Sequence, residues 1–442
     1  ADGATRATAF RLDALTELRK AVRERTDALS EALREDLNKS AGESYLTEIG
    51  LVMQELECHI RHLKRWSRSR RVSTPLTLWP SRRPEPLGVA LIVAPWNYPV
   101  QLLLCPLVGA ISAGNCVLLK SSPLVPHVEA ALRDLIAETF GPEYVAFVEG
   151  GGDVLDELLK RRFDSIFFTG GSKYGRVVME AAAKNLTPVT LELGGKSPCI
   201  VDETANVKRA AQRVAWGKGI NCGQTCVAPD FIYCDEKRKE ALITELKRQI
   251  TKQFGNEPLK NPAYGKIINK KHFDRIRNLM LPEKVIFGGQ SDSDALQITP
   301  TLLDDVTFDD AIMQEEIFGP LLPVVTYRTL EEAVHKINSM DCPLALYLFS
   351  QDKSHIQYMT SCCHFGGGCI NDTVIHLATP YMGFGGCGES GMGSYHGKEG
   401  FDTFSHTKSI VDKKTWIDLP IRYQPYTLLK KRLLKMFLGF FA

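Results

Sequence analysis

The sequence predicts an α/β protein built from two consecutive open-sheet domains. Continuous apolar runs recur from residue 88 and again from about residue 198, and each is followed by a helix-like stretch. This alternation is typical of buried parallel strands joined by crossover helices. The chain has 442 residues, 44% of them hydrophobic, which is enough to bury the cores of about two or three domains.

The charge balance and the cysteines limit the class of protein. Lys and Arg together number 54 and Asp and Glu 52, so there is no overall basic field that would bind nucleic acid. The 12 cysteines lie inside apolar runs rather than at scaffold-like spacing, which predicts reduced thiols. The first residues are polar and show no secretory signal. We therefore expect a cytoplasmic protein with no nucleic-acid partner.

The elements follow in order along the chain. Residues 7–66 show helical spacing with an interruption at 38–42, which predicts two long surface helices. Residues 68–86 mix Arg, Ser, Thr and Pro without a period, which predicts an arm between layers. Strands are then predicted at 89–94, 116–119, 145–148, 165–168, 198–201, 231–234, 284–287 and 344–349.

Two polar residues directly follow predicted strands, at the sheet edge where open α/β folds bind ligands. Asn97 lies in residues 94–99 (Ala-Pro-Trp-Asn-Tyr-Pro), where two prolines fix the backbone. Its amide could therefore bind developing negative charge, although a turn Asn that caps its own loop is the alternative. Lys120 ends another strand-like run, and a solvated Lys is its alternative.

A glycine-rich turn follows the strand predicted at 165–168. Gly170, Gly171 and Gly175 would let the backbone approach a phosphate, with a helix N-terminus behind them. The turn is not the GxGxxG fingerprint, and a turn of this kind without a ligand is commoner.

Glu192 and Cys226 are the candidates for covalent chemistry. Glu192 interrupts a strand-like run, so burial would raise its pKa toward that of a general base; an ion pair with Lys196 is the alternative. Cys226 lies in a loop between Gly and Pro residues, where a thiolate could be exposed. Cys222 is a rival thiol. A zinc site formed by the two cysteines lacks the four ligands that it requires.

Five segments together resemble the aldehyde dehydrogenase superfamily, and the resemblance extends over about residues 35–410. They are residues 94–99, 191–198, 221–230, 314–320 and 384–393. The pattern is most similar to class 3, the branch that includes the fatty aldehyde dehydrogenases. The segment at 314–320 by itself predicts only a helix end or turn.

The resemblance implies a domain organisation. A Rossmann-like cofactor-binding domain would comprise residues 1–67 and 87–194, and a catalytic domain residues 195–400. Bridging or oligomerisation segments would comprise 68–86 and 401–425, with a C-terminal amphipathic helix at 426–442. The resemblance also implies a homodimer.

The resemblance also implies roles for individual residues. Cys226 would attack the aldehyde, Asn97 would hold the oxyanion and Glu192 would activate water for hydrolysis of a thioester. The cofactor NAD would be bound by Trp96, Lys120, Gly170, Gly171, Gly175, Glu316 and Phe318. No metal is expected. A CoA-acylating relative and a non-catalytic protein on the same fold are the alternatives.

Departures from the family pattern bear on the choice of cofactor. Pro123 stands three positions after Lys120, where relatives often carry an acid that would repel a 2′-phosphate. Gly171 replaces a polar residue, and Lys173 follows it. These differences favour use of NADP as well as NAD.

The C-terminal tail bears on the substrate and the location. From residue 421 onward there are five basic residues and no acidic one, and the apolar residues are at helical spacing. Such a helix could bind the cytosolic face of an anionic membrane and favour medium-chain or long-chain aldehydes, although aromatic aldehydes stay possible. The alternative is a terminal helix docked on its own subunit or on a dimer partner.

Overall fold

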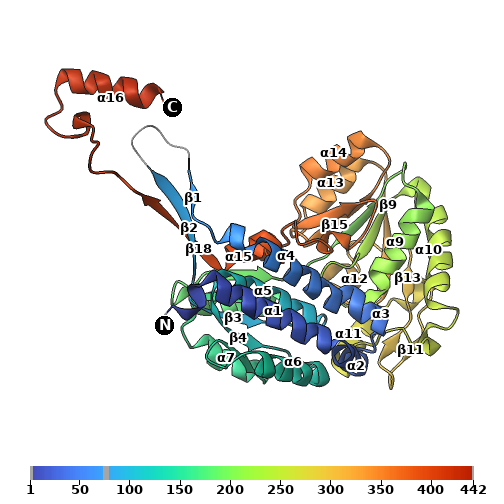
Figure 1. Ribbon diagram of the computed structural model, residues 1–442. Helices are drawn as coiled ribbons and strands as arrows, with labels where there is room; N and C mark the ends of the chain where they lie inside the picture. Colours follow the sequence, from blue (N-terminus) through green and yellow to red (C-terminus); the bar gives the residue numbers. More distant parts are fainter. Residues whose placement is uncertain (1–2, 73–78, 441–442) are drawn as a thin grey trace.

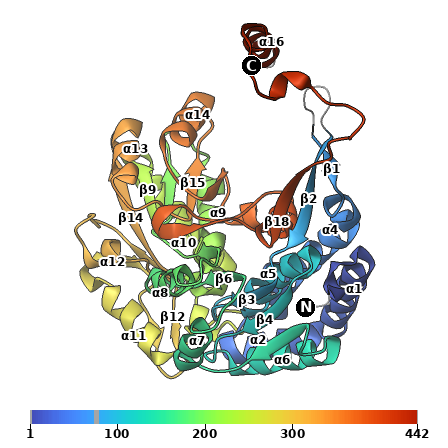
Figure 2. The same ribbon diagram turned by 90° about the vertical axis from the view of Figure 1, so that its left-hand side faces the viewer.

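Two open sheets and a projecting three-stranded arm organise the chain (Figure 1). This computed structural model describes residues 3–72 and 79–440. The predicted α/β architecture with two sheets and an arm is confirmed. The two sheets lie in separate lobes that face each other, and the arm extends away from both (Figures 1 and 2).

The first sheet has six strands in the order β17-β7-β6-β3-β4-β5. Their bounds are β3 (Val89–Val93), β4 (Cys116–Lys120), β5 (Val145–Val148), β6 (Ser165–Thr169), β7 (Val189–Glu192) and β17 (Gly391–Met392). All neighbours are parallel except β17, which runs antiparallel to β7. In β3, Ala90 and Ile92 face one core and Leu91 and Val93 the other, so both faces of the sheet are buried.

Helices cover both faces of this sheet. They are α1 (Thr8–Glu24), α2 (Thr26–Leu37), α3 (Ala41–Ser44), α4 (Gly50–Trp66), α5 (Pro99–Ala113), α6 (Pro126–Thr139), α7 (Gly152–Leu159) and α8 (Ser172–Ala183). The prediction of one uninterrupted helix before residue 38 is wrong, because Arg25 leaves the helical conformation at φ −103° and ψ 12° and separates α1 from α2. A single π-helical turn, η2 (Tyr45–Ile49), precedes α4.

The second sheet has seven strands in the order β10-β13-β14-β9-β8-β15-β16. Their bounds are β8 (Pro198–Val201), β9 (Phe231–Asp235), β10 (Val285–Phe287), β13 (Thr301–Leu303), β14 (Leu321–Tyr327), β15 (Ala345–Phe349) and β16 (Gly367–Ile370). Its helices are α9 (Val207–Gly219), α10 (Lys239–Phe254), α11 (Lys270–Leu279), α12 (Ala311–Gln314), α13 (Leu330–Asn338) and α14 (Lys353–Cys362). The run at 284–287 forms an antiparallel edge strand rather than a buried parallel one.

The arm consists of β1 (Arg70–Arg71), β2 (Pro80–Pro86) and β18 (Ser405–Val411). α15 (Gly397–Thr403) precedes β18 and packs on α5. After β18 the chain continues to α16 (Leu428–Phe440). None of the helices in the described ranges is both long and apolar enough to cross a membrane.

One pair of cysteines departs from the prediction of reduced thiols. Cys342 and Cys387 form a disulfide. The pairing is invisible in the sequence because 45 residues separate the two. Folding brings their Cα atoms to 6.3 Å, within the range that a disulfide needs.

Candidate active site

The candidate residues meet between the two sheets. Asn97 follows β3 and Glu192 ends β7, so both lie at the carboxyl edge of the first sheet. Cys226 precedes β9, so it lies at the amino edge of the second sheet. The edge at which open α/β sheets bind ligands therefore faces the loop that carries the thiol.

A strained turn carries Cys226. Asn221 and Cys222 both adopt left-handed backbone conformations, with φ 47° and 53°, although neither is glycine. Gly223 continues the turn at φ 73°, and a Cβ there would meet the carbonyl oxygen of Gly319 at 2.3 Å. The turn directs the two thiols apart. Cys226 is partly exposed and lines a cavity, whereas Cys222 is buried in the core of the second lobe.

The electrostatics of the Cys226 thiol reflect its surroundings. Burial raises its pKa, and the carboxylates of Glu316 and Glu192 raise it further. The backbone N–H groups of Cys226 and Val227 act in the opposite direction. Both carboxyl groups thus lie close enough to influence the sulfur.

Glu192 is a buried carboxyl group without an ion-pair partner. Glu192 is only 2% exposed, and neither of its carboxyl oxygens has a hydrogen-bond partner among the described residues. Burial raises its pKa well above the ordinary value. The alternative ion pair does not form, because Lys196 Nζ donates instead to Asp230 Oδ2 at 2.6 Å.

Asn97 is held against the loop that carries Cys226. Its Nδ2 donates to the carbonyl of Gln224 at 3.1 Å, which leaves the second N–H of the amide available. Next to it, the Tyr98 hydroxyl and Thr225 Oγ1 lie 2.6 Å apart. These contacts link the end of β3 to the two residues that precede Cys226.

The glycine turn and Lys120 lie along the same sheet edge. Gly170 N–H donates to the Glu192 carbonyl at 3.0 Å, so the turn adjoins that residue. A Cβ at Gly171 would have no described atom within 4 Å, whereas one at Gly175 would meet Leu193 at 2.7 Å. Lys120 Nζ donates to the carbonyl of Gly150 at 2.8 Å, and burial lowers its pKa.

Glu316 and two aromatic residues form the other side of the site. A Cβ at Gly194 would lie 2.4 Å from the Glu316 carboxyl group, so only glycine admits it there. Burial raises the pKa of Glu316 to about 8. Phe318 packs edge-on against Trp96, with ring centroids 5.5 Å apart.

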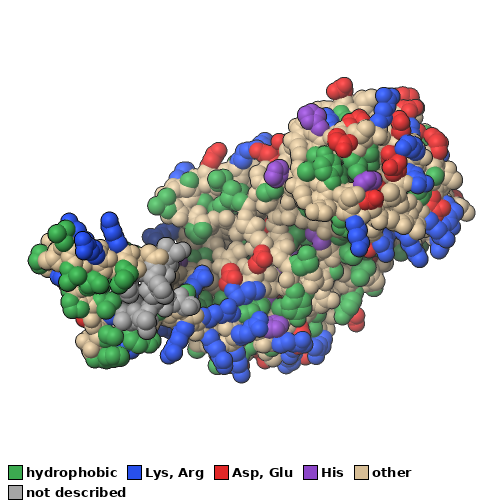
Figure 3. Space-filling view, turned by 90° about the horizontal axis from the view of Figure 1, so that it is seen from above, with side chains coloured by type: hydrophobic (Ala, Val, Ile, Leu, Met, Phe, Trp, Pro, Cys, Tyr) green, Lys and Arg blue, Asp and Glu red, His purple; other side chains and the backbone are tan. Residues whose placement is uncertain are grey.

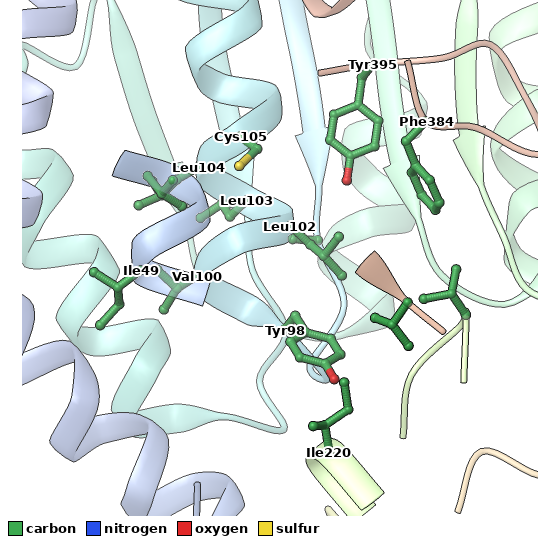
Figure 4. Close-up of a cluster of buried hydrophobic side chains, with 14 of the residues drawn as sticks. Ile49, Tyr98, Val100, Leu102, Leu103, Leu104, Cys105, Ile220, Phe384 and Tyr395 are labelled. Carbon is green, nitrogen blue, oxygen red and sulfur yellow. The ribbon is translucent and has the colours of Figure 1, made fainter. Parts of the chain in front are cut away.

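An apolar cavity of about 140 Å³ opens beside Cys226. Its lining includes Tyr98, Leu102, Phe384 and Tyr395, which are labelled in Figure 4. The other lining residues that sequence reasoning did not single out include Leu46, Leu51, Trp216, Ile220, Ile375 and Leu377. They come from segments far apart in the chain, so no local pattern could reveal them.

Comparisons with known proteins identify the family. Residues 4–410 match the aldehyde dehydrogenase family. The chain belongs to this family. It is 47% identical over 427 residues, 96% of the chain and 93% of the relative, to 4,4'-diaponeurosporen-aldehyde dehydrogenase of Staphylococcus aureus.

Two further relatives extend the match. The chain is 43% identical over 414 residues, 93% of the chain and 91% of the relative, to the "dimeric NADP-preferring" aldehyde dehydrogenase of Rattus norvegicus. The solved structure of Staphylococcus aureus AldH in a substrate-bound state superimposes with a TM-score of 0.97 at 45% identity, covering 98% of this chain and 96% of that one. The predicted activity of this aldehyde dehydrogenase, oxidation of aldehydes with NAD(P), is thereby confirmed.

No metal is implicated by the arrangement of side chains. Within the part of the chain that the structure describes, no three or more His, Cys, Asp or Glu side chains gather as a metal site would require.

Proposed function

We propose that the protein oxidises apolar aldehydes with NAD(P) through a thiohemiacetal and a thioester formed on Cys226, with Asn97 and Glu192 as the partners of this nucleophile. The observation that carries the proposal is the position of the three groups. The thiol lines an apolar cavity, one N–H of the buried Asn97 amide is available, and the Glu192 carboxyl group has no described partner.

The reaction follows from these groups. The Cys226 thiol gives its proton to solvent water, and its sulfur bonds to the aldehyde carbon while the carbonyl oxygen becomes an oxyanion. The free N–H of Asn97 and the backbone N–H of Cys226 would bind that oxyanion. After oxidation leaves a thioester, Glu192 takes a proton from water, whose oxygen attacks the thioester carbon. The carboxylate leaves and the thiolate of Cys226 is restored.

The described residues fit the cofactor. The space next to Gly171 is open at the start of the 12-residue helix α8, where N–H groups could bind a phosphate. Glu316 would accept hydrogen bonds from the nicotinamide ribose, and Phe318 and Trp96 would flank the ring. Lys120 would bind the adenosine ribose. When bound, NAD(P) supplies the acceptor for the hydride that the substrate loses.

The cavity supports a medium-chain or long-chain aliphatic substrate, with an aromatic aldehyde as the alternative. The residues that line it are mostly apolar, and the Tyr98 hydroxyl already forms a hydrogen bond with Thr225. An apolar pocket selects by buried apolar area rather than by hydrogen bonds. The relative named for 4,4'-diaponeurosporen-aldehyde is consistent with an apolar substrate.

Replacement of each thiol in turn tests the assignment of the nucleophile. Cys226→Ala is expected to abolish oxidation of both a fatty and an aromatic aldehyde, because no other described thiol lines the cavity. Cys222→Ala is the matched control and should retain turnover. Activity in the first variant, or equal loss in both, would reject the assignment.

Release of the thioester to CoA instead of water is not favoured, because a carboxyl group that can activate water lies beside the thiol. Product analysis with and without CoA separates the two outcomes. Acyl-CoA as the main product would overturn the hydrolytic mechanism.

We propose that both NAD and NADP are used. Pro123 supplies no carboxylate that would repel a 2′-phosphate, and Lys173 is the second residue of α8, near the open space at Gly171. A relative named NADP-preferring supports the proposal. Turnover with saturating NAD but none with saturating NADP would contradict it.

We propose a cytoplasmic homodimer whose α16 contacts the cytosolic face of a membrane. A relative named dimeric supports the first part. In α16, Leu428 and Leu429 are 80% and 67% exposed, close to Lys430 and Lys431. Figure 3 shows hydrophobic and basic side chains gathered at this end of the molecule. Such a surface suits anionic lipid.

A further inference from the structure

A fully buried ion pair lies behind the candidate oxyanion site. Lys39 follows α2, and Glu48 lies in the π-helical turn η2 before α4. Both side chains are 0% exposed, and Lys39 Nζ lies 2.5 Å from Glu48 Oε1. Burying two charges costs several kcal/mol per ion unless the remaining hydrogen-bonding positions are satisfied. The other contacts of the pair therefore indicate its role.

Among the described residues, the other side-chain hydrogen bonds of the pair are to the backbone at and just after Asn97. Lys39 Nζ donates to the Asn97 carbonyl at 2.9 Å and lies 3.9 Å above the Tyr98 ring. Glu48 Oε2 accepts from the N–H of Val100 at 2.8 Å and, more weakly, from the next N–H at 3.3 Å. The pair thus binds the peptide group before Tyr98 and the peptide groups that follow Pro99.

A second set of contacts holds the same carbonyl from the Cys226 loop. Asn221 Nδ2 donates to the Asn97 carbonyl at 2.7 Å, and the Asn221 N–H donates to Glu43 Oε1, also at 2.7 Å. The carbonyl of Asn97 therefore has two donors, one from each lobe. With the carbonyl held and the start of α5 capped by Glu48, the backbone of Asn97 has little freedom to rotate.

We propose that Lys39 and Glu48 are positioning residues, which fix the backbone of Asn97 so that its side-chain amide is directed at the oxyanion before the substrate binds. The inference rests on the proposed role of Asn97. Donors that are already oriented stabilise developing charge without reorganisation, so a small displacement lowers the rate. The competing explanation is a purely structural link between α2–α4 and α5.

A double-mutant cycle separates the two explanations. Lys39→Met combined with Glu48→Gln removes both charges, while the Gln carbonyl can still accept from the Val100 N–H. The paired substitution is made in the natural chain and in an Asn97→Ala background, and kcat and KM are measured with an aliphatic aldehyde. Removal of one oxyanion donor costs roughly 100-fold to 1,000-fold in kcat, so misdirection is expected to cost about 10-fold or more with little change in KM.

Comparison of the natural chain with the Asn97→Ala variant distinguishes the two explanations. If the pair acts through Asn97, the paired substitution lowers kcat in the natural chain and has no further effect in Asn97→Ala. Equal losses in both backgrounds, or no loss in the natural chain, overturn the inference. Full activity of Asn97→Ala by itself would reject the proposed role of Asn97, so the two failures are distinguishable.

Two further measurements show whether the variants remain folded and whether the nucleophile is unchanged. Thermal unfolding and the rate of Cys226 alkylation by iodoacetamide are measured for each variant, and both are expected to be unchanged. Slower alkylation would show that the pair holds the nucleophile loop instead, which overturns the inference. Glu48→Gln alone is the second variant if the pair does not fold. Lys239→Met with Asp304→Asn removes an ion pair of 2.7 Å outside the site and should leave kcat unchanged.

Discussion

Burial affects the two carboxyl groups next to Cys226 in ways that suit different tasks. Glu192 has no described partner, so its raised pKa favours accepting a proton from water near neutral pH. Glu316 accepts a hydrogen bond from the Gly195 N–H, yet burial still raises its pKa to about 8. Burial therefore favours the protonated form of Glu316 more than it would for an exposed carboxyl group.

The affinity for cofactor is expected to depend on pH through Glu316. Ribose hydroxyls bind best to an ionised carboxylate, and a group with a pKa of about 8 is protonated below that pH and ionised above it. Affinity should therefore rise with pH, by about tenfold between pH 7 and pH 9. Fluorescence titration of the protein with NAD at each pH measures it.

Glu316→Gln should bind NAD more weakly and without this pH dependence. Glu315→Gln, the exposed neighbour, is the matched control and should keep the natural pH profile. A flat profile in the natural chain would contradict the assignment of Glu316 as the ribose acceptor.

Residue identities at the site were predictable, but their partners were not. Glu192 and Cys226 lie in recognisable motifs. In contrast, Lys196 forms its ion pair with Asp230, which is 34 residues away in the sequence. The contact of Lys39 with the Asn97 carbonyl spans 58 residues. Partners of this kind are decided by tertiary packing, which a local sequence pattern does not contain.

At the scale of elements, the Gln224 side chain links the turn before Cys226 to the segment at residues 266–268. Gln224 Nε2 donates to the carbonyls of Asn221 and Lys266, and its Oε1 accepts from the Ile268 N–H at 3.0 Å. These bonds satisfy the buried amide completely and stabilise the left-handed residues of the turn. The position of the nucleophile thus depends on tertiary contacts as well as on the turn itself.

Strands buried on both faces were the most predictable elements, because their apolar runs are continuous. Residues 198–201 were predicted as a strand with the bounds that β8 has. The break at Arg25 and the two-residue strand β17 carry no such signal. β17 forms only because the chain returns to pair with β7 after some 200 residues in the second lobe.

Deletion of residues 426–442 is expected to lower activity on long-chain aldehydes more than on short-chain ones. In Figures 1 and 2, α16 is well separated from the body of its own subunit, so it would act through a membrane or a second copy. The ratio of kcat/KM for a long and a short aldehyde measures the effect. Equal losses on both would reject a role for α16 in substrate access.

At the scale of the whole molecule, the two lobes contribute different parts of one site. The first sheet supplies Asn97 and Glu192 from its strand ends, and the second lobe supplies Cys226 and Glu316. The predicted division between residues 194 and 195 stays a prediction. Because β17 belongs to the first sheet and α15 packs on α5, residues 391–403 are attached to the first lobe.

Because the nucleophile and the base are different residues, removal of the base should stop the reaction after the thioester has formed. Glu192→Gln keeps the shape of the site and removes the base, so oxidation should proceed while hydrolysis fails. Glu180→Gln, an exposed position on α8, is the matched control and should turn over normally.

The most direct test is a single-turnover experiment on Glu192→Gln, with intact-protein mass spectrometry and peptide mapping. The expected result is a burst of about one NAD(P)H per subunit and an acyl group on Cys226 that persists. Continued turnover without an adduct, or an acyl group on Cys222, would contradict covalent catalysis by Cys226 with Glu192 as its base.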